Sequence, residues 1–384
     1  MRDFRDATVV RVLRLDPLML LATLGLIAAS VYTLSTATQD DIAGSPNYYV
    51  YRQLAYSGVG LLLMFLIARF DYSRLREWKI GIYVFLIASI LLVYALGFSA
   101  RGSQRAVQLP FFNFQASELG KLLLAVGLSA FVVDRIRRLT DRETTSRVVL
   151  LALIPAILVV AQPDLGSGLV YLAILLTVLF VAGTPWTHFA ALGGLAALAI
   201  AVTLVAAPAV GVDVLKPYQK DRLTAFLSPS DDASAKEGYQ INQSLTAIGS
   251  GGKTGRGDDA TQTELDFLPE HHTDFIFSVV GEEFGFVGAA LVLSLFALLI
   301  WRALKVLTIS KNFYGALVAG GITAMLMFQV FVNVGMTIGI MPITGIPLPL
   351  MSYGGSSVLT TLMALGILQS IHAQAREVAA AKGL

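Results

Sequence analysis

The chain lacks cysteine and is poor in charged residues for its length of 384 residues. Without cysteine it has no disulfide framework and no thiol chemistry. Charged residues make up 14% of the sequence, whereas soluble domains usually carry about 25%. Hydrophobic residues make up 55%, and the mean hydropathy is +0.70. These values predict a polytopic membrane protein and exclude a soluble one.

A basic block, a signal peptide and an internal repeat are also missing. The net charge is only +2, which argues against binding to nucleic acid. The N-terminus has no short apolar stretch followed by a small-residue cleavage site, so we expect no signal peptide and retention of the span at 18–36. No repeat of 20–50 residues and no low-complexity tract is visible.

What the sequence does contain is a series of apolar runs of about 20 residues, the length that crosses a membrane as a helix. Ten appear, at 17–36, 54–70, 80–98, 117–133, 148–162, 165–183, 187–208, 275–302, 313–336 and 353–372. The Pro and Gly of 162–166 indicate a turn, because one helix of about 36 residues would be nearly twice the length needed. The sequence predicts one all-α membrane domain over 1–384, with ten transmembrane helices and a large loop, 209–274, between the seventh and eighth.

Lys and Arg are distributed unevenly between the two sides of this arrangement. If the N-terminus is inside, the inner segments hold 18 of the 28 basic residues, and the short outer loops hold only Arg52, Arg101 and Arg105. Cytoplasmic loops carry such an excess. We therefore expect both termini in the cytoplasm and the 209–274 loop outside. Within that loop, 239–248 has the pattern of a short amphipathic helix with Ile241, Leu245 and Ile248 on one face, lying against the bilayer or the bundle.

Asp274 is the first candidate catalytic residue. It stands where the outer loop enters the apolar run that begins at Phe275. A carboxylate beside apolar side chains is partly desolvated, which raises its pKa toward the range of a general base. The alternative is structural, since Thr273 and Asp274 precede a helix, and aspartate is a common N-cap residue.

Glu270 and His271 are candidate metal ligands, with His272 and Asp274 beside them. Adjacent histidines point in different directions on a helix, and no defined zinc spacing is present. A hard divalent cation such as Mg²⁺ or Mn²⁺, bridging a carboxylate and a substrate phosphate, suits these groups better. The sequence demands no cofactor.

Arg101 and Arg105 flank a glycine in an outer loop. Guanidinium groups bind phosphate oxygens in a bidentate fork, so this pair suits a diphosphate. Contact of an interfacial arginine with lipid headgroups is the alternative. Both readings place these residues at the outer face of the membrane.

Glu118 and Lys121 are three residues apart near the outer end of a span, so they share a helix face and can pair. Charge at this depth is costly and usually faces a cavity. Asp164, also at the outer face, could complete a network of three. We expect Lys121 near a substrate phosphate with Glu118 holding it; a structural ion pair that locks helices together is the alternative.

Three prolines interrupt residues 341–357 and exclude a regular helix there. We expect an extended or re-entrant segment that lines a cavity, because irregular backbone is tolerated at membrane depth only in such places. Gly354 to Ser357 then open the last helix, whose free N–H groups could face an anion. Ser352, Tyr353 and Ser356 are therefore substrate-binding candidates, and helix capping by serine is the alternative.

Taken together, these segments resemble the SEDS family of shape, elongation, division and sporulation proteins. The resemblance covers most of the chain and rests on 101–105, 114–121, 162–166, 267–277 and 347–357, in the family's order. It implies a ten-helix bundle in the bacterial inner (plasma) membrane with the active site facing outside. Asp274 matches the family's essential outer-loop aspartate, and Glu118 and Lys121 match its intramembrane charged pair.

The family activity, by this resemblance, is peptidoglycan glycosyltransfer. The enzyme polymerises lipid II, a disaccharide-pentapeptide on undecaprenyl diphosphate, into β-1,4 glycan strands beside a class B penicillin-binding protein. The resemblance is to the branch that acts in cell-wall elongation, which implies elongation-complex membrane proteins as further partners. The chain departs from the family pattern at Ala106, where tryptophan is usual, and at Ala116, where proline is usual.

Two other functions use the same ingredients. A flippase for lipid-linked cell-wall precursors would also need intramembrane charges, a broken segment and a polyprenyl substrate, together with a polar path to the inner face. A non-catalytic scaffold for a synthase partner would leave polymerisation intact when Asp274 is neutralised. The gathering of Asp274, Arg101, Glu118 and Asp164 on the outer side favours the transferase.

Overall fold

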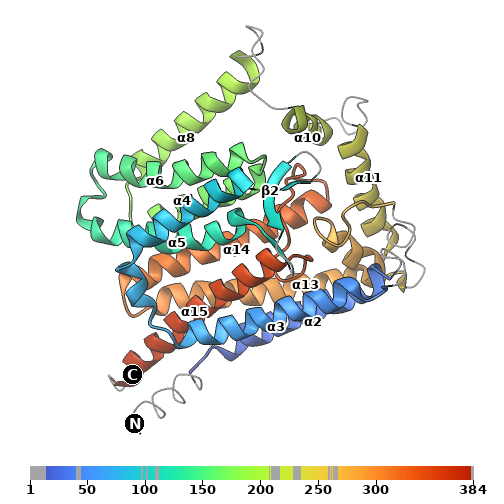
Figure 1. Ribbon diagram of the computed structural model, residues 1–384, viewed down its shortest axis with the longest axis horizontal. Coiled ribbons are helices and arrows are strands. Elements are labelled where there is room, and N and C mark those ends of the chain that lie inside the picture. Colours follow the sequence, from blue (N-terminus) through green and yellow to red (C-terminus); the bar gives the residue numbers. More distant parts are fainter. Residues whose placement is uncertain are drawn as a thin grey trace.

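The computed structural model describes residues 14–39, 45–96, 98–100, 103–108, 112–206, 208, 217–227, 235–257, 260, 262 and 267–381. Helices follow all of the expected apolar runs (Figure 1). They are α2 (Pro17–Ala37), α3 (Tyr48–Arg69), α4 (Lys79–Leu96), α5 (Ala116–Asp134), α6 (Arg142–Ala161), α7 (Leu165–Val181), α8 (Trp186–Ala201), α13 (Ile276–Ile309), α14 (Phe313–Thr337) and α15 (Gly355–Ala381). Short helices η1 (Tyr72–Arg76), η2 (Ile136–Arg138) and η3 (Val202–Ala206) lie beside them. The prediction of an all-α membrane protein is confirmed.

Nine of the helices in the described residues are long and apolar enough to cross a membrane. The remaining apolar helix, α7, has 17 residues, which corresponds to a length of about 25 Å. It is separated from α6 by the predicted turn, since α6 ends at Ala161 and α7 begins at Leu165. A count of ten spans stays a prediction that rests on α7.

Polar side chains set where several of these helices begin. Asp16 caps α2 by accepting from the backbone N–H groups of Leu18 and Met19. Asn312 caps α14 in the same way through Gly315 N, and Asp164 caps α7 through Ser167 N. These caps satisfy N–H groups that have no partner within their own helix.

The centre of the bundle is formed by α5, α14 and α15, in which most residues are buried. Helix α15 packs along α3, and α14 packs between α7 and α13 (Figure 1). Helix α8 is different, because no residue of Trp186–Ala201 is buried. In Figure 1 it runs away from α6 towards α10 (Pro217–Leu227). Helix α8 therefore packs only loosely against the rest of the bundle.

A small sheet and two helices cover one end of the bundle. Strands β1 (Phe98–Ala100), β2 (Ser103–Gln108) and β3 (Asn113–Phe114) form an antiparallel sheet in the order β1-β2-β3. The sequence did not predict these strands. Helix α11 (Ala235–Ser250) includes the amphipathic helix expected at 239–248, and it packs on α13 and α14.

The predicted apolar face of α11 is wrong in one position, because Leu245 is 43% exposed while Ile241 is buried. The reason is a hydrogen bond at Ser244, whose hydroxyl lies 2.6 Å from Ser278 Oγ and donates to Thr337 O at 2.7 Å. This polar contact turns the Ser244 side of the helix inward. Leu245, one residue later, consequently faces out.

Helix α13 is broken near its start by Gly285, whose φ of 61° and ψ of −159° are not helical. Only glycine adopts this conformation without strain. The break lies against the turn after α11, since a methyl group on Gly285 would lie 2.3 Å from Gly255 N. The short buried segment before the break begins directly after Asp274.

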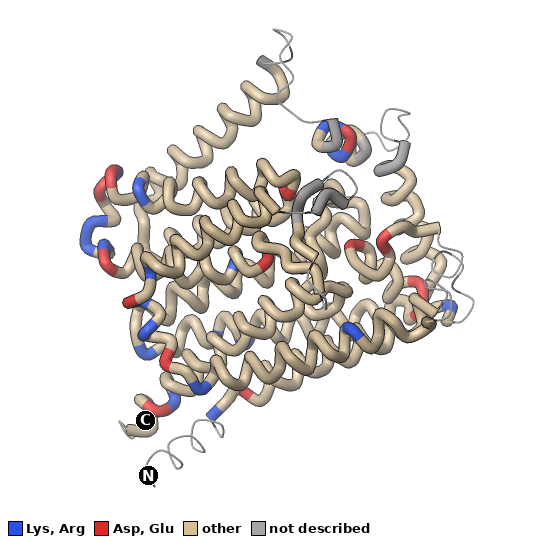
Figure 2. Tube along the Cα trace, viewed as in Figure 1, with Lys and Arg blue, Asp and Glu red and all other residues tan. Residues whose placement is uncertain are grey.

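The charged residues gather at the two ends of the helices, with few between them (Figure 2). The start of α2 and the end of α15 lie at one of these ends, while α11 and the start of α13 lie at the other (Figure 1). A chain that spans a membrane requires this distribution, because unpaired charge inside hydrocarbon is costly.

Candidate functional site

A cavity of about 520 Å³ opens at the end of the bundle that carries α11 and the sheet. Six regions line it: the start of α3, the sheet, α10, α11, the turn before α13, and the irregular segment that leads into α15. Its lining residues include Arg52, Tyr56, Ala106, Asn113, Gln115, Arg222, Gln240, Glu270, Thr273, Asp274, Ile343, Gly345, Pro347, Tyr353 and Ser356. The size is that of a small-molecule site.

Asp274 lines this cavity and is half-buried. The N-cap position of α13 is occupied by Phe275, without a side-chain cap. The alternative that Asp274 is the N-cap residue is therefore wrong. Its backbone is fixed instead, because Asn333 Nδ2 donates to Asp274 O at 2.9 Å and to Ile346 O at 2.8 Å. One buried amide thus holds the turn with Asp274 against the irregular segment.

Arg222, on α10, lies beside the Asp274 carboxylate. A methyl group on Gly345 would lie 3.5 Å from Asp274 Oδ2 and 3.8 Å from Arg222 Nη2, so both groups flank the same point. The guanidinium is anchored by a hydrogen bond from Nη1 to Thr344 O at 3.1 Å. Gly345 has a φ of 71°, which a side chain rarely adopts.

The segment 338–354 contains no regular helix or strand, as its prolines predicted, and it lines the cavity. Ser352 is 1% exposed; its hydroxyl donates to Thr273 O at 2.6 Å and accepts from Leu348 N at 2.8 Å. The backbone N–H of Tyr353 donates to His272 O at 2.9 Å. These contacts place Ser352 behind the cavity wall, where it holds the Asp274 turn.

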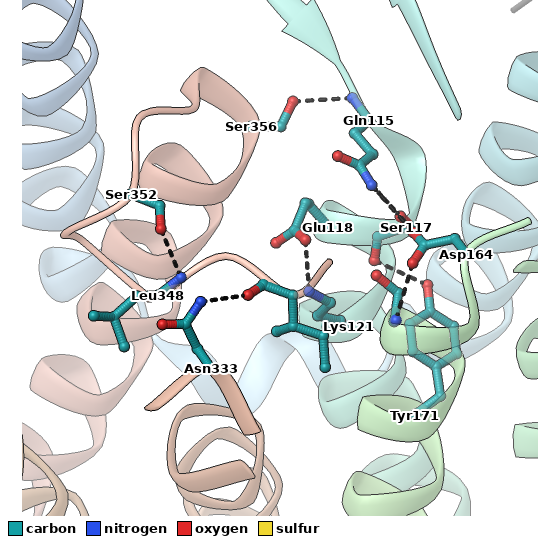
Figure 3. A network of polar contacts seen from close by, with 12 residues as sticks. Gln115, Ser117, Glu118, Lys121, Asp164, Tyr171, Asn333, Leu348, Ser352 and Ser356 are labelled. Atoms are coloured by element: carbon teal, nitrogen blue, oxygen red, sulfur yellow. Dashed lines mark hydrogen bonds and ion pairs between the residues drawn. The ribbon is translucent and has the colours of Figure 1, made fainter. Parts of the chain in front are cut away.

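Tyr353 and Ser356 both line the cavity. Burial raises the pKa of the Tyr353 phenol, whose hydroxyl lies close to Arg52 and Tyr56, so it stays protonated and can donate a hydrogen bond. Ser356 Oγ donates to Asn113 O at 2.7 Å and accepts from Gln115 N at 2.9 Å. The start of α15 is thereby tied to the sheet and to α5, as Figure 3 shows for Gln115.

Glu118 and Lys121 form an ion pair at 2.6 Å, with side chains that are 3% and 1% exposed (Figure 3). Both residues belong to α5, so the pair joins no two helices. The alternative of a lock between helices is therefore wrong for this contact. Lys121 has three N–H donors, and Glu118 Oε1 takes one of them.

Asp164 lies beside this pair and joins α7 to the start of α5. Its Oδ2 accepts from Ser117 Oγ at 2.7 Å and from Gln115 Nε2 at 3.1 Å. Tyr171, also on α7, donates from its hydroxyl to Ser117 O at 3.2 Å. Figure 3 shows these groups around the first turn of α5, one turn before Lys121.

The two candidate metal ligands separate in the structure. Glu270 lines the cavity and has a left-handed backbone with a φ of 58°. His271 is 2% exposed, and its Nδ1 lies 3.2 Å from Leu268 O within the same turn. The ring of His272 packs on that of Tyr49, with centroids 4.6 Å apart. Among the described residues, no group of three or more His, Asp or Glu side chains could hold a metal ion.

The two arginines predicted for the diphosphate cannot be placed as side chains. Arg101 lies outside the described residues, and of Arg105 only the strand position in β2 is described. Ala106, where the family usually has tryptophan, lines the cavity directly.

Sequence reasoning missed several cavity residues, above all Arg52 and Arg222. Arg52 was counted as a loop residue, but it lies in the first turns of α3. An arginine inside a membrane helix is a functional signal that could have found it. Nothing in the sequence distinguished Arg222, because the expected loop contains six basic residues.

An apolar groove of about 330 Å³ adjoins the cavity, between α7 and α8. Leu165, Leu169, Ile200 and Leu204 form its walls, and it shares Arg222 and Ile343 with the cavity. Helix α8, which contributes one wall of this groove, has no buried residue.

Comparison with known proteins agrees with this arrangement. The family model of the FtsW, RodA and SpoVE cell cycle proteins matches residues 12–377. The chain is 37% identical over 361 residues to peptidoglycan glycosyltransferase MrdB of Escherichia coli (strain K12), covering 93% of each chain. It is 35% identical over 363 residues to stage V sporulation protein E of Bacillus subtilis (strain 168), covering 93% of this chain and 95% of the relative.

Among solved structures, a chain from a peptidoglycan synthase complex that coordinates polymerization and crosslinking has the same fold. The TM-score is 0.79 at 33% identity, over 94% of this chain and 98% of the other. The match of the family model over nearly the whole sequence shows that the chain belongs to the SEDS family of FtsW/RodA/SpoVE proteins.

Proposed function

We propose that the chain is a peptidoglycan glycosyltransferase that polymerises lipid II into β-1,4 glycan strands, with Asp274 as general base. The relatives named peptidoglycan glycosyltransferases support the reaction class. The observation that carries the assignment of the base is geometric: the Asp274 carboxylate lies in the cavity, and a guanidinium lies near the same point beside Gly345.

The stereochemistry of the reaction needs one base. The donor carries an α-linked diphosphate at C1 and the product bond is β, so a single displacement with inversion suffices. Asp274 would accept the proton of the acceptor's 4-hydroxyl while that oxygen attacks C1 and the C1–diphosphate bond breaks. The Arg222 guanidinium, which lies near this carboxylate, would face the same substrate.

The leaving diphosphate gains negative charge, and cationic side chains line the route to it. Arg52 and Arg222 face the cavity, and Lys121 has N–H donors beyond the one used by Glu118. Fixed cations aimed at developing charge stabilise a transition state more than a ground state. Arg101 and Arg105 belong to the same proposal from the sequence, as do Asp164, Tyr353 and Ser356.

The prenyl tail of the substrate would occupy the apolar groove between α7 and α8. That groove shares Arg222 with the cavity, so a tail in the groove places its diphosphate beside a guanidinium. Apolar walls formed by Leu169 and Leu204 match a hydrocarbon chain. The headgroup and the tail would therefore be bound on the two sides of α10.

A divalent cation would be held by Glu270 and Asp274, the two carboxylates in the cavity. His271 does not fit this role, because it is buried outside the lining of the cavity. When bound, such an ion would offset charge on the leaving diphosphate. The protein's own part is to hold both carboxylates on one turn.

The role in cell-wall elongation, a class B penicillin-binding protein as partner and elongation-complex proteins around it are part of the same proposal. The fold match to a chain of a peptidoglycan synthase complex supports such a partner. The excess of Lys and Arg on one side supports cytoplasmic termini and a site that faces outside.

The experiment is polymerisation of purified lipid II in detergent, with a penicillin-binding partner that is active only in transpeptidation. Asp274→Asn keeps the shape and removes the base, and it should abolish long glycan. Glu143→Gln, an exposed carboxylate far from the cavity, should leave polymerisation unchanged. Near wild-type glycan from folded Asp274→Asn would show that the mechanism is wrong.

The flippase is the second outcome of this experiment. If neither protein forms glycan and both move lipid II across liposomes, the activity is transport. A scaffold is tested by repeating the assay with a synthase partner that can itself polymerise. If Asp274→Asn leaves that polymerisation intact while the chain alone forms no glycan, the chain is a scaffold.

A further inference from the structure

A second cavity, of about 830 Å³, lies at the end of the molecule opposite to α11 and the sheet. The start of α2, the second half of α13 and the end of α15 line it. Its polar lining consists of Arg14, Arg302, Lys305, His372 and Arg376, and no acidic side chain is among the described lining residues. The cavity is therefore strongly cationic.

This cavity is separate from the candidate functional site. Helix α15 contacts the first cavity at Ser356 and the second at Arg376, a distance of about 30 Å along the helix. That is the thickness of the hydrocarbon core of a membrane. Between the two, Leu362, Leu365 and Leu368 are fully buried. The second cavity thus lies at the opposite face of the membrane.

One buried ion pair forms the floor of this cavity. Arg302 is 7% exposed, and its guanidinium lies 2.5 Å (Nη2) and 2.7 Å (Nε) from Asp16 Oδ2. The other oxygen of Asp16 accepts from the N–H groups of Leu18 and Met19 at 3.1 Å each. Asp16 is therefore fully used within the fold, by the cap of α2, by Arg302 and by the nearby ring of His372.

Three other basic groups of the cavity have no counter-charge in the part of the chain that the structure describes. Arg14, Lys305 and Arg376 form no ion pair there. His372 is 4% exposed, and its Nδ1 is buried without a hydrogen-bond partner, 3.7 Å from Asp16 Oδ2. Like charges that converge on one space repel unless an anion lies between them.

The remaining lining of the cavity is apolar. Leu15, Leu18 and Leu20 line it from α2 and the residue before its cap, and Ala379 lines it from α15. Trp301, which is 54% exposed with its ring 5.3 Å from the Arg302 guanidinium, is placed as an aromatic residue at a membrane interface. A ligand for this cavity needs both an anionic group and hydrocarbon.

We propose that the cationic cavity binds the phosphate headgroup of an acidic phospholipid, drawn from the leaflet at the face that carries the start of α2 and the end of α15. Arg14, Lys305 and Arg376 would surround the phosphate, and the acyl chains would lie along Leu18. Bound lipid would connect the start of α2, the second half of α13 and the end of α15, which all line this cavity. The proposal does not depend on Asp274 or on glycosyl transfer.

The test measures lipid retained by the purified full chain after delipidation in detergent, by native mass spectrometry. Phosphatidylglycerol and phosphatidylcholine are added in equal amounts. Each Lys or Arg near an anionic membrane surface contributes about fivefold to binding, so wild type should retain phosphatidylglycerol at least about tenfold better. The variant Arg14→Gln, Lys305→Gln, Arg376→Gln should lose this preference.

The matched control removes three positive charges from the same end of the molecule outside the cavity, by Arg135→Gln, Arg137→Gln and Arg138→Gln, all exposed. It should keep the preference. Equal loss in both triple variants would show a general charge effect and overturn the site. Arg302 is left unchanged because it also pairs with Asp16.

Two further outcomes decide the proposal without a stable triple variant. A wild-type chain that does not prefer phosphatidylglycerol overturns it at once. Inorganic phosphate or pyrophosphate that displaces the lipid at equal concentration would show a site for free phosphate rather than for a headgroup. Retention of phosphatidylglycerol in excess phosphate, reduced in the single variant Arg376→Gln, supports the lipid.

Discussion

Two buried ion pairs lie near opposite ends of the bundle, and the chain uses them differently. Asp16 and Arg302 come from positions 286 residues apart and join the start of α2 to α13. Glu118 and Lys121 are three residues apart on one helix. Both are almost completely buried, so both pay for desolvation of two charges. Only the pair of Asp16 and Arg302 connects two helices.

The difference teaches which pair is structural. The Asp16 carboxylate accepts hydrogen bonds from Arg302 and from the N–H groups that it caps at the start of α2. The Lys121 ammonium donates one of its three N–H groups to Glu118. It lies on the helix that begins after Gln115, a residue that lines the cavity. A buried charge that holds no helix and retains donors is expected to act on a ligand. We therefore expect mutations at the two pairs to separate stability from activity.

The largest expected effect is on the stability of Asp16→Asn. Asparagine keeps the cap of α2 but leaves Arg302 as a buried, unpaired charge. Breaking a buried pair in this way costs about 3–5 kcal/mol. Thermal unfolding in detergent should show a strongly lowered midpoint, while polymerisation per folded molecule stays at the wild-type level.

Asp134→Asn is the control for this substitution. Asp134 pairs with Arg76 and Lys79, but its side chain is 23% exposed, and exposed pairs contribute about 0–1 kcal/mol. Its unfolding midpoint should hardly change. An Asp16→Asn protein as stable as this control would remove the structural role of the Asp16 pair.

The next effect concerns Lys121→Met in the candidate site. Removing one donor aimed at developing negative charge typically costs about 10²–10³ in rate. We expect polymerisation to fall by at least about 100-fold, measured as glycan formed per folded protein. The substitution also leaves the buried Glu118 carboxylate without Lys121 as its partner, which should lower the midpoint of thermal unfolding.

The double variant Glu118→Gln, Lys121→Met separates these two consequences. Two neutral side chains of similar size need no compensation, so much of the stability should return. Polymerisation should stay at the level of Lys121→Met. Recovery of both stability and polymerisation would make the pair structural and would break the contrast with Asp16.

The membrane helices could be predicted from the sequence because hydrocarbon imposes a strong rule. Every backbone group inside it must be paired, so each long apolar run becomes a helix. The short strands β1 to β3 follow no such rule, since their pairing lies in the connection between α4 and α5. The orientation of α11 was also beyond the sequence, because Ser244 faces inward through bonds to α13 and α14.

The residues of the candidate site that could be predicted are charged residues within or next to apolar runs of the sequence. Asp274, Glu118 and Lys121 were visible for that reason, and the structure places Asp274 in the cavity and the pair in the helix beside it. Arg222 was not visible, because its position depends on α10 folding back over Gly345. Ser352 was predicted to bind substrate because it precedes the last helix. Its hydroxyl instead forms hydrogen bonds with Thr273 O and Leu348 N behind the cavity wall.

The smallest expected effect sharpens the comparison within α5 itself. Tyr171 donates to Ser117 O in the first turn of α5, and its hydroxyl fits closely over Gly120. Tyr171→Phe removes one neutral hydrogen bond, which costs about 1 kcal/mol. Because that turn carries Glu118, polymerisation should also fall, by a few-fold.

Tyr314→Phe is the matched control, since its hydroxyl donates to Val126 O deeper in the same helix, at 3.4 Å. It should lower stability without lowering polymerisation. If both variants left polymerisation unchanged, the first turn of α5 would not position the pair, and Lys121 would have to act through its charge alone.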